Sequence, residues 1–145
     1  MYKDFADVLG IELESINYKV IDEELEVLER DEGDVGFDLP IRSISNEFRG
    51  DNESDEVLLR PNQDVYLNLN VACKAPQGTF FDLRSRSSAY DKLNVKLTNS
   101  VGTIDPSYRG DEDEIVAHVH NTGNKAVKIK RGNRPFQLVC LPYFT

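Results

Sequence analysis

Hydrophobic and polar residues alternate along much of this chain with a period of two, the period of a strand. The clearest case is residues 65–72, where Val, Leu, Leu and Val alternate with Tyr, Asn, Asn and Ala. Because successive side chains of a strand point to opposite faces, this pattern predicts a strand with one buried face. Shorter segments of the same kind predict further strands at residues 16–21, 79–84, 95–99, 115–120, 126–130 and 136–141.

Turn-forming residues separate these segments, at 76–78, 121–124 and 130–133. Residues 87–93 predict one or two helical turns, and the polar, turn-rich residues 42–56 predict a loop or a small insertion. Residues 1–15 predict an extra N-terminal arm or a short helix. Many short strands joined by close turns indicate an all-β sandwich or barrel, organised as a single domain over residues 1–145.

The charge of the chain limits its partners. The 145 residues contain 26 Asp and Glu against 17 Lys and Arg, a formal net charge of −9. This balance argues against binding to a nucleic-acid backbone, which needs clustered cations. The acidic residues concentrate at 22–38, 51–56 and 111–114, where we expect solvated loops that could dock a protein partner. Arg84, Arg86, Arg131 and Arg134 stand out against this background.

Hydropathy and the N-terminal sequence predict a cytoplasmic protein. No apolar run approaches the roughly 18 residues that span a bilayer, and the first residues lack the layout of a signal peptide. Cys73 and Cys140 lie in apolar, strand-like segments, so we expect buried free thiols. No CxxC motif is present, and a zinc site is not expected.

The stretch Asn99-Ser-Val-Gly-Thr-Ile-Asp-Pro-Ser-Tyr-Arg-Gly110 is the most informative part of the sequence. Gly102 permits close backbone approach, and Pro106 biases the preceding Asp105 toward an extended conformation. We interpret the stretch as a hairpin that offers backbone groups and one aimed carboxylate to a small planar ligand. Taken alone, an ordinary turn explains the same residues better.

Four segments of the chain occur in the order and at the spacings of the trimeric dUTPase family: Gly33-Asp-Val-Gly-Phe-Asp-Leu39, Arg86-Ser-Ser88, the stretch 99–110 and Arg131-Gly-Asn-Arg-Pro-Phe-Gln-Leu-Val139. Over residues 18–141 the chain resembles this family, most closely its members from Gram-positive bacteria and phages. The resemblance implies a distorted jelly-roll-type β-barrel, known as a β-clip. It also implies a homotrimer with shared active sites that hydrolyses dUTP to dUMP and pyrophosphate with Mg²⁺.

The same resemblance assigns the nucleoside site to the stretch 99–110. Asp105 is implied as the catalytic residue that activates the attacking water, which a carboxylate can do when the water lies within hydrogen-bond reach. Tyr108 is implied to pack under the deoxyribose and leave no room for a 2′-hydroxyl. Asn99, with backbone groups near Gly102 and Ile104, is implied to bind uracil, whose N3–H lies between two carbonyl groups.

The phosphate site is implied to come from the other three segments. Arg86, Ser87 and Ser88 resemble the phosphate-contacting residues of the family's second motif, although Ser85 stands where the family usually has proline. A planar guanidinium matches phosphate oxygens well. Gln137 resembles the phosphate-contacting glutamine of the fourth motif. Asp38 is implied to reach Mg²⁺ through water, with Asp34 as the lesser candidate, because Mg²⁺ keeps several waters.

Alternatives to a fully active dUTPase stay open at this point. The family's glycine-rich tail, a lid over the triphosphate, has no counterpart in the chain, which ends eight residues after Gln137. We therefore expect a shortened chain, a tailless enzyme with slow turnover, or a nucleotide-sensing regulatory protein on the same scaffold. A dCTP deaminase is disfavoured because His118 stands where those enzymes place a catalytic glutamate. His118 and His120 share a strand face, and we expect them at the surface or an interface.

Overall fold

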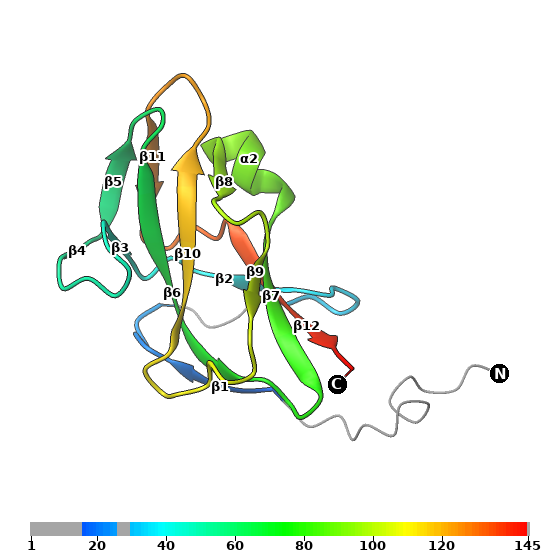
Figure 1. The fold of residues 1–145 in the computed structure, drawn as a ribbon. Coiled ribbons are helices and arrows are strands. Elements are labelled where there is room, and N and C mark those ends of the chain that lie inside the picture. The colour runs from blue at the N-terminus through cyan, green and yellow to red at the C-terminus, as the bar shows by residue number, and fades with distance from the viewer. Residues whose placement is uncertain (1–15, 26–29, 145) are drawn as a thin grey trace.

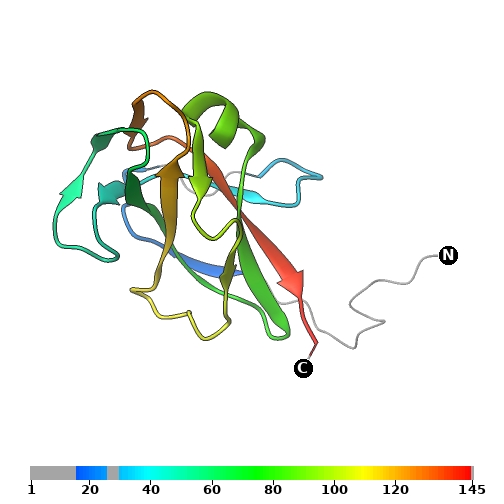
Figure 2. The same ribbon diagram turned by 45° about the horizontal axis from the view of Figure 1, so that its top comes forward.

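The chain folds into two main antiparallel sheets that enclose a core, as a computed structural model describes for residues 16–25 and 30–144 (Figures 1 and 2). The six-stranded sheet has the order β4-β3-β6-β10-β8 with β1 also paired to β6: β1 (Asn17–Val20), β3 (Ser43–Ser45), β4 (Glu53–Ser54), β6 (Asp64–Lys74), β8 (Val95–Leu97) and β10 (Glu114–Asn121). The four-stranded sheet has the order β2-β12-β7-β9: β2 (Phe37–Leu39), β12 (Phe136–Pro142), β7 (Thr79–Ser85) and β9 (Gly102–Ile104). A third pair joins β5 (Glu56–Leu59) to β11 (Val127–Lys130), and helix α2 (Ser87–Leu93) follows β7.

Large apolar side chains from both main sheets fill the space between them. Phe81 of β7 and Phe136 of β12 meet Leu67 and Leu69 of β6, and none of the four is more than 2% exposed. Burying a side chain of this size stabilises the fold by about 1.5–3 kcal/mol. The prediction of an all-β fold with many short strands is confirmed, as are the strands and the helical turns over 87–93.

The expected loop at 42–56 is wrong in part. Ser43–Ser45 forms the buried strand β3, Glu53–Ser54 forms β4 and Glu56 begins β5, so the loop lies mainly between β3 and β4. The two serines of β3 can be buried because Ser43 and Ser45 both accept hydrogen bonds from the buried Asn68 Nδ2, at 2.8 and 3.1 Å. Hydrogen bonding within this buried cluster removes the penalty of burying polar groups, which the sequence pattern alone does not reveal.

The expectation of a single buried face on the central strand is also wrong. Both faces of β6 are buried from Leu67 to Cys73. On the polar face, Asn68 bonds to β3, and Asn70 bonds to Asp22 just after β1. The alternation therefore separates an apolar core face from a hydrogen-bonded face.

Asn70 marks a bulge in β6. Its φ is +71°, a left-handed conformation that asparagine tolerates better than most residues. The pairing of β6 with β10 shifts register here, and the Asn70 N–H donates to Glu114 Oε2 at 2.9 Å instead of to a backbone carbonyl. The buried Asn70 side chain accepts from Asp22 N at 2.7 Å and donates to Asp22 O at 3.1 Å. The bulge therefore fixes the position of Glu114, the first residue of β10.

Arg42 also binds Glu114 at the start of β10. Its guanidinium donates to both oxygens of Glu114, each at 2.8 Å, and to both oxygens of Glu53. The hydrogen bonds from Arg42 lower the pKa of the Glu53 carboxyl below its ordinary value. Two forked ion pairs thus tie β3 and β4 to the first residue of β10.

The predicted arm at 1–15 lies outside the described residues. Of the two cysteines, Cys73 is buried and Cys140 is half-buried, and both are free thiols. Burial raises the pKa of the Cys73 thiol to about 12, so it stays protonated at neutral pH. The prediction of free thiols is confirmed for both residues, and the prediction of burial for Cys73 alone.

Candidate functional site

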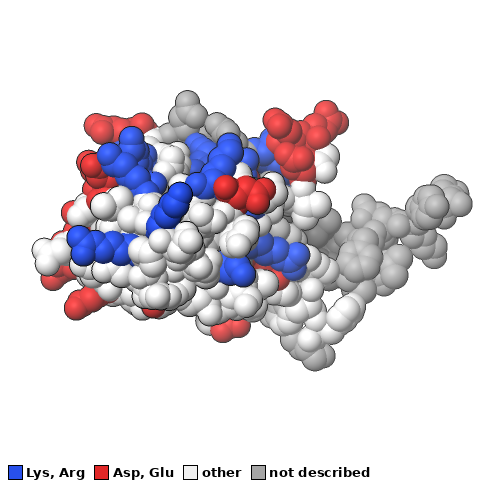
Figure 3. All heavy atoms as spheres, turned by 90° about the horizontal axis from the view of Figure 1, so that it is seen from above, with Lys and Arg blue, Asp and Glu red and all other residues white. Residues whose placement is uncertain are grey.

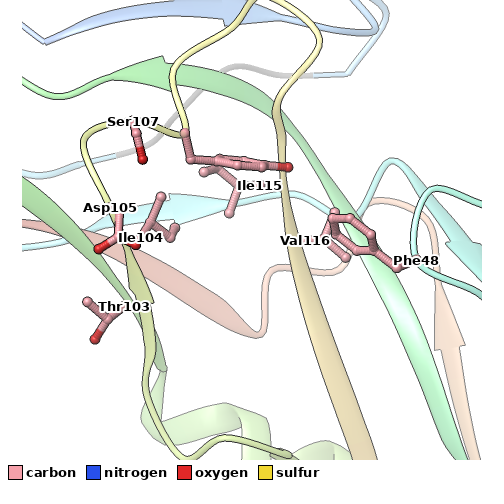
Figure 4. A pocket seen from close by; sticks show the side chains of 8 residues that line it. Phe48, Thr103, Ile104, Asp105, Ser107, Ile115 and Val116 are labelled. Carbon is pink, nitrogen blue, oxygen red and sulfur yellow. The ribbon is translucent and has the colours of Figure 1, made fainter.

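A cavity of about 350 Å³ opens between the segment that follows β9 and the start of β10 (Figure 4). It brings together residues from three parts of the chain. Its lining consists of Phe48, Thr103, Ile104, Asp105, Ser107, Tyr108, Ile115 and Val116. Three residues predicted for the nucleoside site, Ile104, Asp105 and Tyr108, therefore share one cavity. Figure 4 shows Asp105 and Ser107 on one side and Phe48 on the other.

Asp105 presents an exposed carboxylate to this cavity. Its carbonyl accepts a hydrogen bond from Tyr108 N at 3.0 Å, which closes a turn around Pro106. Across the described parts of the chain, no residue forms a hydrogen bond or an ion pair with the carboxylate itself. A carboxylate held by its backbone and open to solvent can accept a proton from a bound water.

Tyr108 is fixed at both ends. Its ring packs against the core, and its hydroxyl donates to the Glu114 carbonyl at 2.6 Å. The same hydroxyl accepts a hydrogen bond from Arg49 Nη2 at 3.0 Å. The ring can therefore act as a rigid wall of the cavity, the role predicted for the sugar-contacting residue.

The predicted hairpin over 99–110 is wrong. Strand β8, before this stretch, pairs with β10 in the six-stranded sheet, while β9 pairs with β7 in the four-stranded sheet. The stretch is therefore a crossing between the two sheets. Its corner is tight, with Val101 N donating to Asn99 O at 2.7 Å and Ser100 at a φ of +65°.

Asn99 and Gly102, the predicted uracil-binding pair, lie beside the cavity rather than in its lining. A Cβ added to Gly102 would lie 3.3 Å from Leu83 Cβ and 3.7 Å from Asn99 Nδ2. The absence of a side chain thus lets β9 approach β7 closely and lets the exposed Asn99 amide lie near the backbone of Gly102. A role for these two residues in binding uracil stays a prediction.

A second cluster forms at the end of the four-stranded sheet next to α2. Arg86 Nε lies 3.2 Å from Asp38 Oδ1, and Arg86 Nη1 donates to the Arg134 carbonyl at 2.7 Å. Arg134 Nη1 in turn donates to the Asp38 carbonyl at 2.9 Å. Gln137 lies opposite Asp38 in the pairing of β12 with β2. Figure 3, which looks onto the α2 end, shows Lys and Arg side chains gathered on this face.

The local chain explains how this cluster is placed. Ser87 and Ser88 begin α2, and Arg86 precedes them with its N–H donating to the Pro135 carbonyl at 2.9 Å. Gly36 is buried against Gln137, and a side chain there would overlap Gln137 Oε1. Residues of the first, second and fourth predicted segments therefore meet at one place.

The two clusters do not meet within one chain. In the antiparallel pairing of β7 with β9, Ile104 lies opposite Phe81, whereas Arg86 follows the far end of β7. Five residue spacings separate Phe81 from Arg86, or roughly 17 Å at about 3.3 Å per residue of strand. Figure 1 shows the same arrangement, with α2 near one end of β7 and the segment after β9 near the other.

The remaining arginines that the sequence singled out have structural contacts. Arg131 donates to Asp22 Oδ2 at 2.8 Å and to the Arg42 carbonyl at 2.9 Å, and Arg84 pairs with Asp82 at 2.9 Å. In the acidic loops, Glu53 pairs with Arg42 and Asp113 pairs with Arg49. Docking of a protein partner on these loops stays a prediction.

His118 and His120 do share a face of β10, as predicted. His118 stacks on Tyr66 with ring centroids 4.1 Å apart, and both histidines contact Asp64. Within residues 16–25 and 30–144, no group of three or more His, Cys, Asp or Glu side chains is arranged to hold a metal ion. The same residues include no helix with the length and apolar character needed to cross a bilayer.

Several residues of the cavity and of the Arg86 cluster were not predicted from the sequence. Thr103 and Ser107 lie between the residues that it singled out, and Arg134 was noted for its charge without a role. Phe48 and Arg49 lie more than fifty residues from the stretch that they contact. No local pattern in the sequence marks those two residues.

The sequence of the chain is similar to those of known proteins. The family model of dUTPase matches residues 26–145. A deoxyuridine 5′-triphosphate nucleotidohydrolase of a Hydrogenobaculum strain is 38% identical over 88 residues, which cover 61% of this chain and 59% of that protein. One of Zymomonas mobilis is 33% identical over 107 residues, which cover 72% of this chain and 71% of that protein.

A solved structure shows the same fold. A mutant dUTPase from phage phi11 of S. aureus superposes with a TM-score of 0.69 at 19% identity, over 91% of this chain and 93% of that one. That structure is described as revealing the coordination of a structural Mg(II) ion. The likeness confirms the expected jelly-roll-like β fold.

Proposed function

Because this chain belongs to the dUTPase family, we propose that it hydrolyses dUTP to dUMP and pyrophosphate. The observation that carries the proposal is the cavity that joins Ile104, Asp105 and Tyr108. A second support is the cluster of Arg86, Arg134 and Gln137 around Asp38, which suits an anionic triphosphate.

Asp105 acts as the general base in this proposal. Its carboxylate accepts a proton from a water molecule, whose oxygen forms a bond to the α-phosphorus. The bond between that phosphorus and the bridging oxygen of the β-phosphate breaks, and pyrophosphate leaves with the electron pair. Positioning and charge stabilisation supply most of the acceleration in such phosphoryl transfers.

Tyr108 selects the sugar. Its hydroxyl is held by Glu114 O and Arg49 Nη2, so the ring cannot turn aside to admit a larger ligand. A 2′-hydroxyl is then rejected by shape. A pocket that rejects an added hydroxyl in this way discriminates by about a hundredfold at most.

Arg86, Ser87, Ser88 and Gln137 bind the phosphates, and the guanidinium of Arg134 adds a further positive charge. The donor set suits Mg²⁺ only in an indirect role, because Asp38 is the one carboxylate of the cluster and is paired with Arg86. Mg²⁺ is bound in many sites by one or two carboxylates, waters and substrate phosphates. When bound, the ion would neutralise charge on the triphosphate, with Asp38 reaching it through water.

We further propose a homotrimer in which one copy supplies Asp105 and Tyr108 and its neighbour supplies Arg86 and Gln137. The spacing along β7 supports this division, because Arg86 and Phe81, the residue opposite Ile104, lie roughly 17 Å apart along a strand that stays extended. In a closed ring of three identical chains, one surface of each copy packs against a different surface of the next.

The test is a product assay with the 145-residue chain, Mg²⁺ and either dUTP or dCTP. We expect pyrophosphate from dUTP, little from dCTP, and loss of turnover when Mg²⁺ is chelated. Ammonia released from dCTP would instead identify a deaminase. Tight binding of dUTP without release of pyrophosphate would contradict the proposed hydrolysis and favour a nucleotide-sensing role.

A further inference from the structure

The loop between β3 and β4 places two side chains beside the cavity. Phe48 lines the cavity although its side chain belongs to a segment far away in the sequence, and it is 52% exposed. The next residue, Arg49, has a φ of +54°, a left-handed conformation that arginine rarely adopts. Such a conformation persists where surrounding contacts fix it, so the contacts of Arg49 are informative.

Arg49 reaches across the cavity rim to the segment that carries the predicted sugar-contacting residue. Its Nη2 atom donates to Tyr108 Oη at 3.0 Å and to Asp113 Oδ1 at 2.6 Å. Its guanidinium carbon lies 5.4 Å from the ring centroids of both Phe48 and Tyr108. The cation thus lies against both aromatic walls of the cavity and donates to the hydroxyl of one of them.

Asp113 extends this contact to the backbone of the adjoining turn. Its other oxygen, Oδ2, accepts from Gly110 N at 2.9 Å. The hydrogen bond from Arg49 lowers the pKa of the Asp113 carboxyl, so the pair stays charged at neutral pH. The loop at 46–52 and the turn at 110–113 are therefore connected through one guanidinium.

The contacts leave Tyr108 one orientation. A phenolic hydroxyl has a single hydrogen to donate, and here it goes to Glu114 O. Arg49 supplies the donor that the hydroxyl accepts. Without Arg49 the ring keeps its core packing and its hydrogen bond to Glu114 O, but it loses the second of the two hydrogen bonds at its outer end and the cation beside its face.

We propose that Arg49 is a positioning residue that holds Tyr108 as the wall of the sugar site and so sets the preference for deoxyribose over ribose. This inference rests on the proposed function of the same site. Arg49 and Asp113 are partly exposed, with side-chain exposures of 45% and 26%. Exposed ion pairs contribute little to stability, so removing Arg49 leaves the fold intact and changes the site.

The experiment compares binding of dUMP and UMP by calorimetry, and hydrolysis of dUTP and UTP, for the wild type, R49A, R49K and Y108F. We expect R49A to lower the preference for the deoxy compounds roughly tenfold, through weaker rejection of ribose. R49K restores part of it, because an ammonium keeps the charge that pairs with Asp113 but lacks the planar guanidinium that lies 5.4 Å from both ring centroids. R60A, at an exposed arginine in the turn before β6, is the matched control and keeps the wild-type preference.

A double variant separates positioning from general weakening. If Arg49 acts through Tyr108, R49A combined with Y108F loses no more preference than the larger single effect. An R49A protein that discriminates as well as the wild type, within twofold, overturns the inference while leaving the proposed function in place. A wild type that neither binds dUMP nor hydrolyses dUTP overturns the proposed function and this inference with it.

Discussion

Replacing Asp105 with asparagine is expected to lower the kcat for dUTP about a hundred- to ten-thousand-fold, the usual contribution of a general base. Asparagine has the same shape as aspartate but cannot accept the proton of the attacking water. The carboxylate is exposed, and no described residue pairs with it, so the substitution leaves the fold and the affinity for dUTP close to those of the wild type. Pyrophosphate release and calorimetric binding of dUTP measure the two effects separately.

Asp111→Asn is the matched control for this prediction. Asp111 lies on the neighbouring turn, is exposed, and among the described residues makes only a long ion pair, with Lys74 at 3.7 Å. Its variant should turn over dUTP at nearly the wild-type rate. An Asp105→Asn protein that keeps more than about a tenth of wild-type kcat would exclude Asp105 as the base.

Replacing Asn70 with alanine is expected to destabilise the chain by about 3 kcal/mol. Alanine adopts the left-handed conformation at a φ of +71° less readily than asparagine does. It also removes both side-chain hydrogen bonds to Asp22, at 2.7 and 3.1 Å, from a buried site. Urea denaturation of the variant and the wild type under identical conditions measures the difference.

Two variants divide this loss into its parts. Asn62 has a similar φ of +65° but is exposed, so Asn62→Ala should show only the smaller conformational effect. Asn70→Gly removes the hydrogen bonds, but glycine adopts a positive φ readily. We therefore expect a loss of stability between those of the other two variants. Stability of Asn70→Ala within about 1 kcal/mol of the wild type would show that the bulge does not depend on this side chain.

The strands of the fold were predictable where apolar residues alternate, and they were missed where polar groups pair in the interior. The 65–72 pattern gave the central strand because its Val and Leu side chains face the core. Ser43–Ser45 looked like part of a loop, because nothing local shows that Asn68 satisfies both hydroxyls. The bulge at Asn70 depends on Glu114 and Asp22, which are distant in sequence.

The site was predictable in its parts but not in its arrangement. Resemblance to the family selected Asp105 and Tyr108, which the structure places in one cavity, and Arg86 and Asp38, which it brings together elsewhere. The separation of these two clusters depends on the register of β9 against β7, which the sequence does not specify. Arg49 could not be predicted, because its contacts come from the tertiary fold alone.

We propose that a complete site needs two copies of the chain, and mixing two inactive variants decides whether it does. Asp105→Asn and Arg86→Ala each lose activity, and random mixed trimers at a one-to-one ratio should recover about a quarter of wild-type turnover, because each site draws one half from each of two neighbours. Mixing Asp105→Asn with Tyr108→Ala serves as the control and should give no more turnover than the average of the two variants measured separately, since both residues lie in the same half. Absence of recovery in mixed assemblies of Asp105→Asn and Arg86→Ala chains would contradict the shared site.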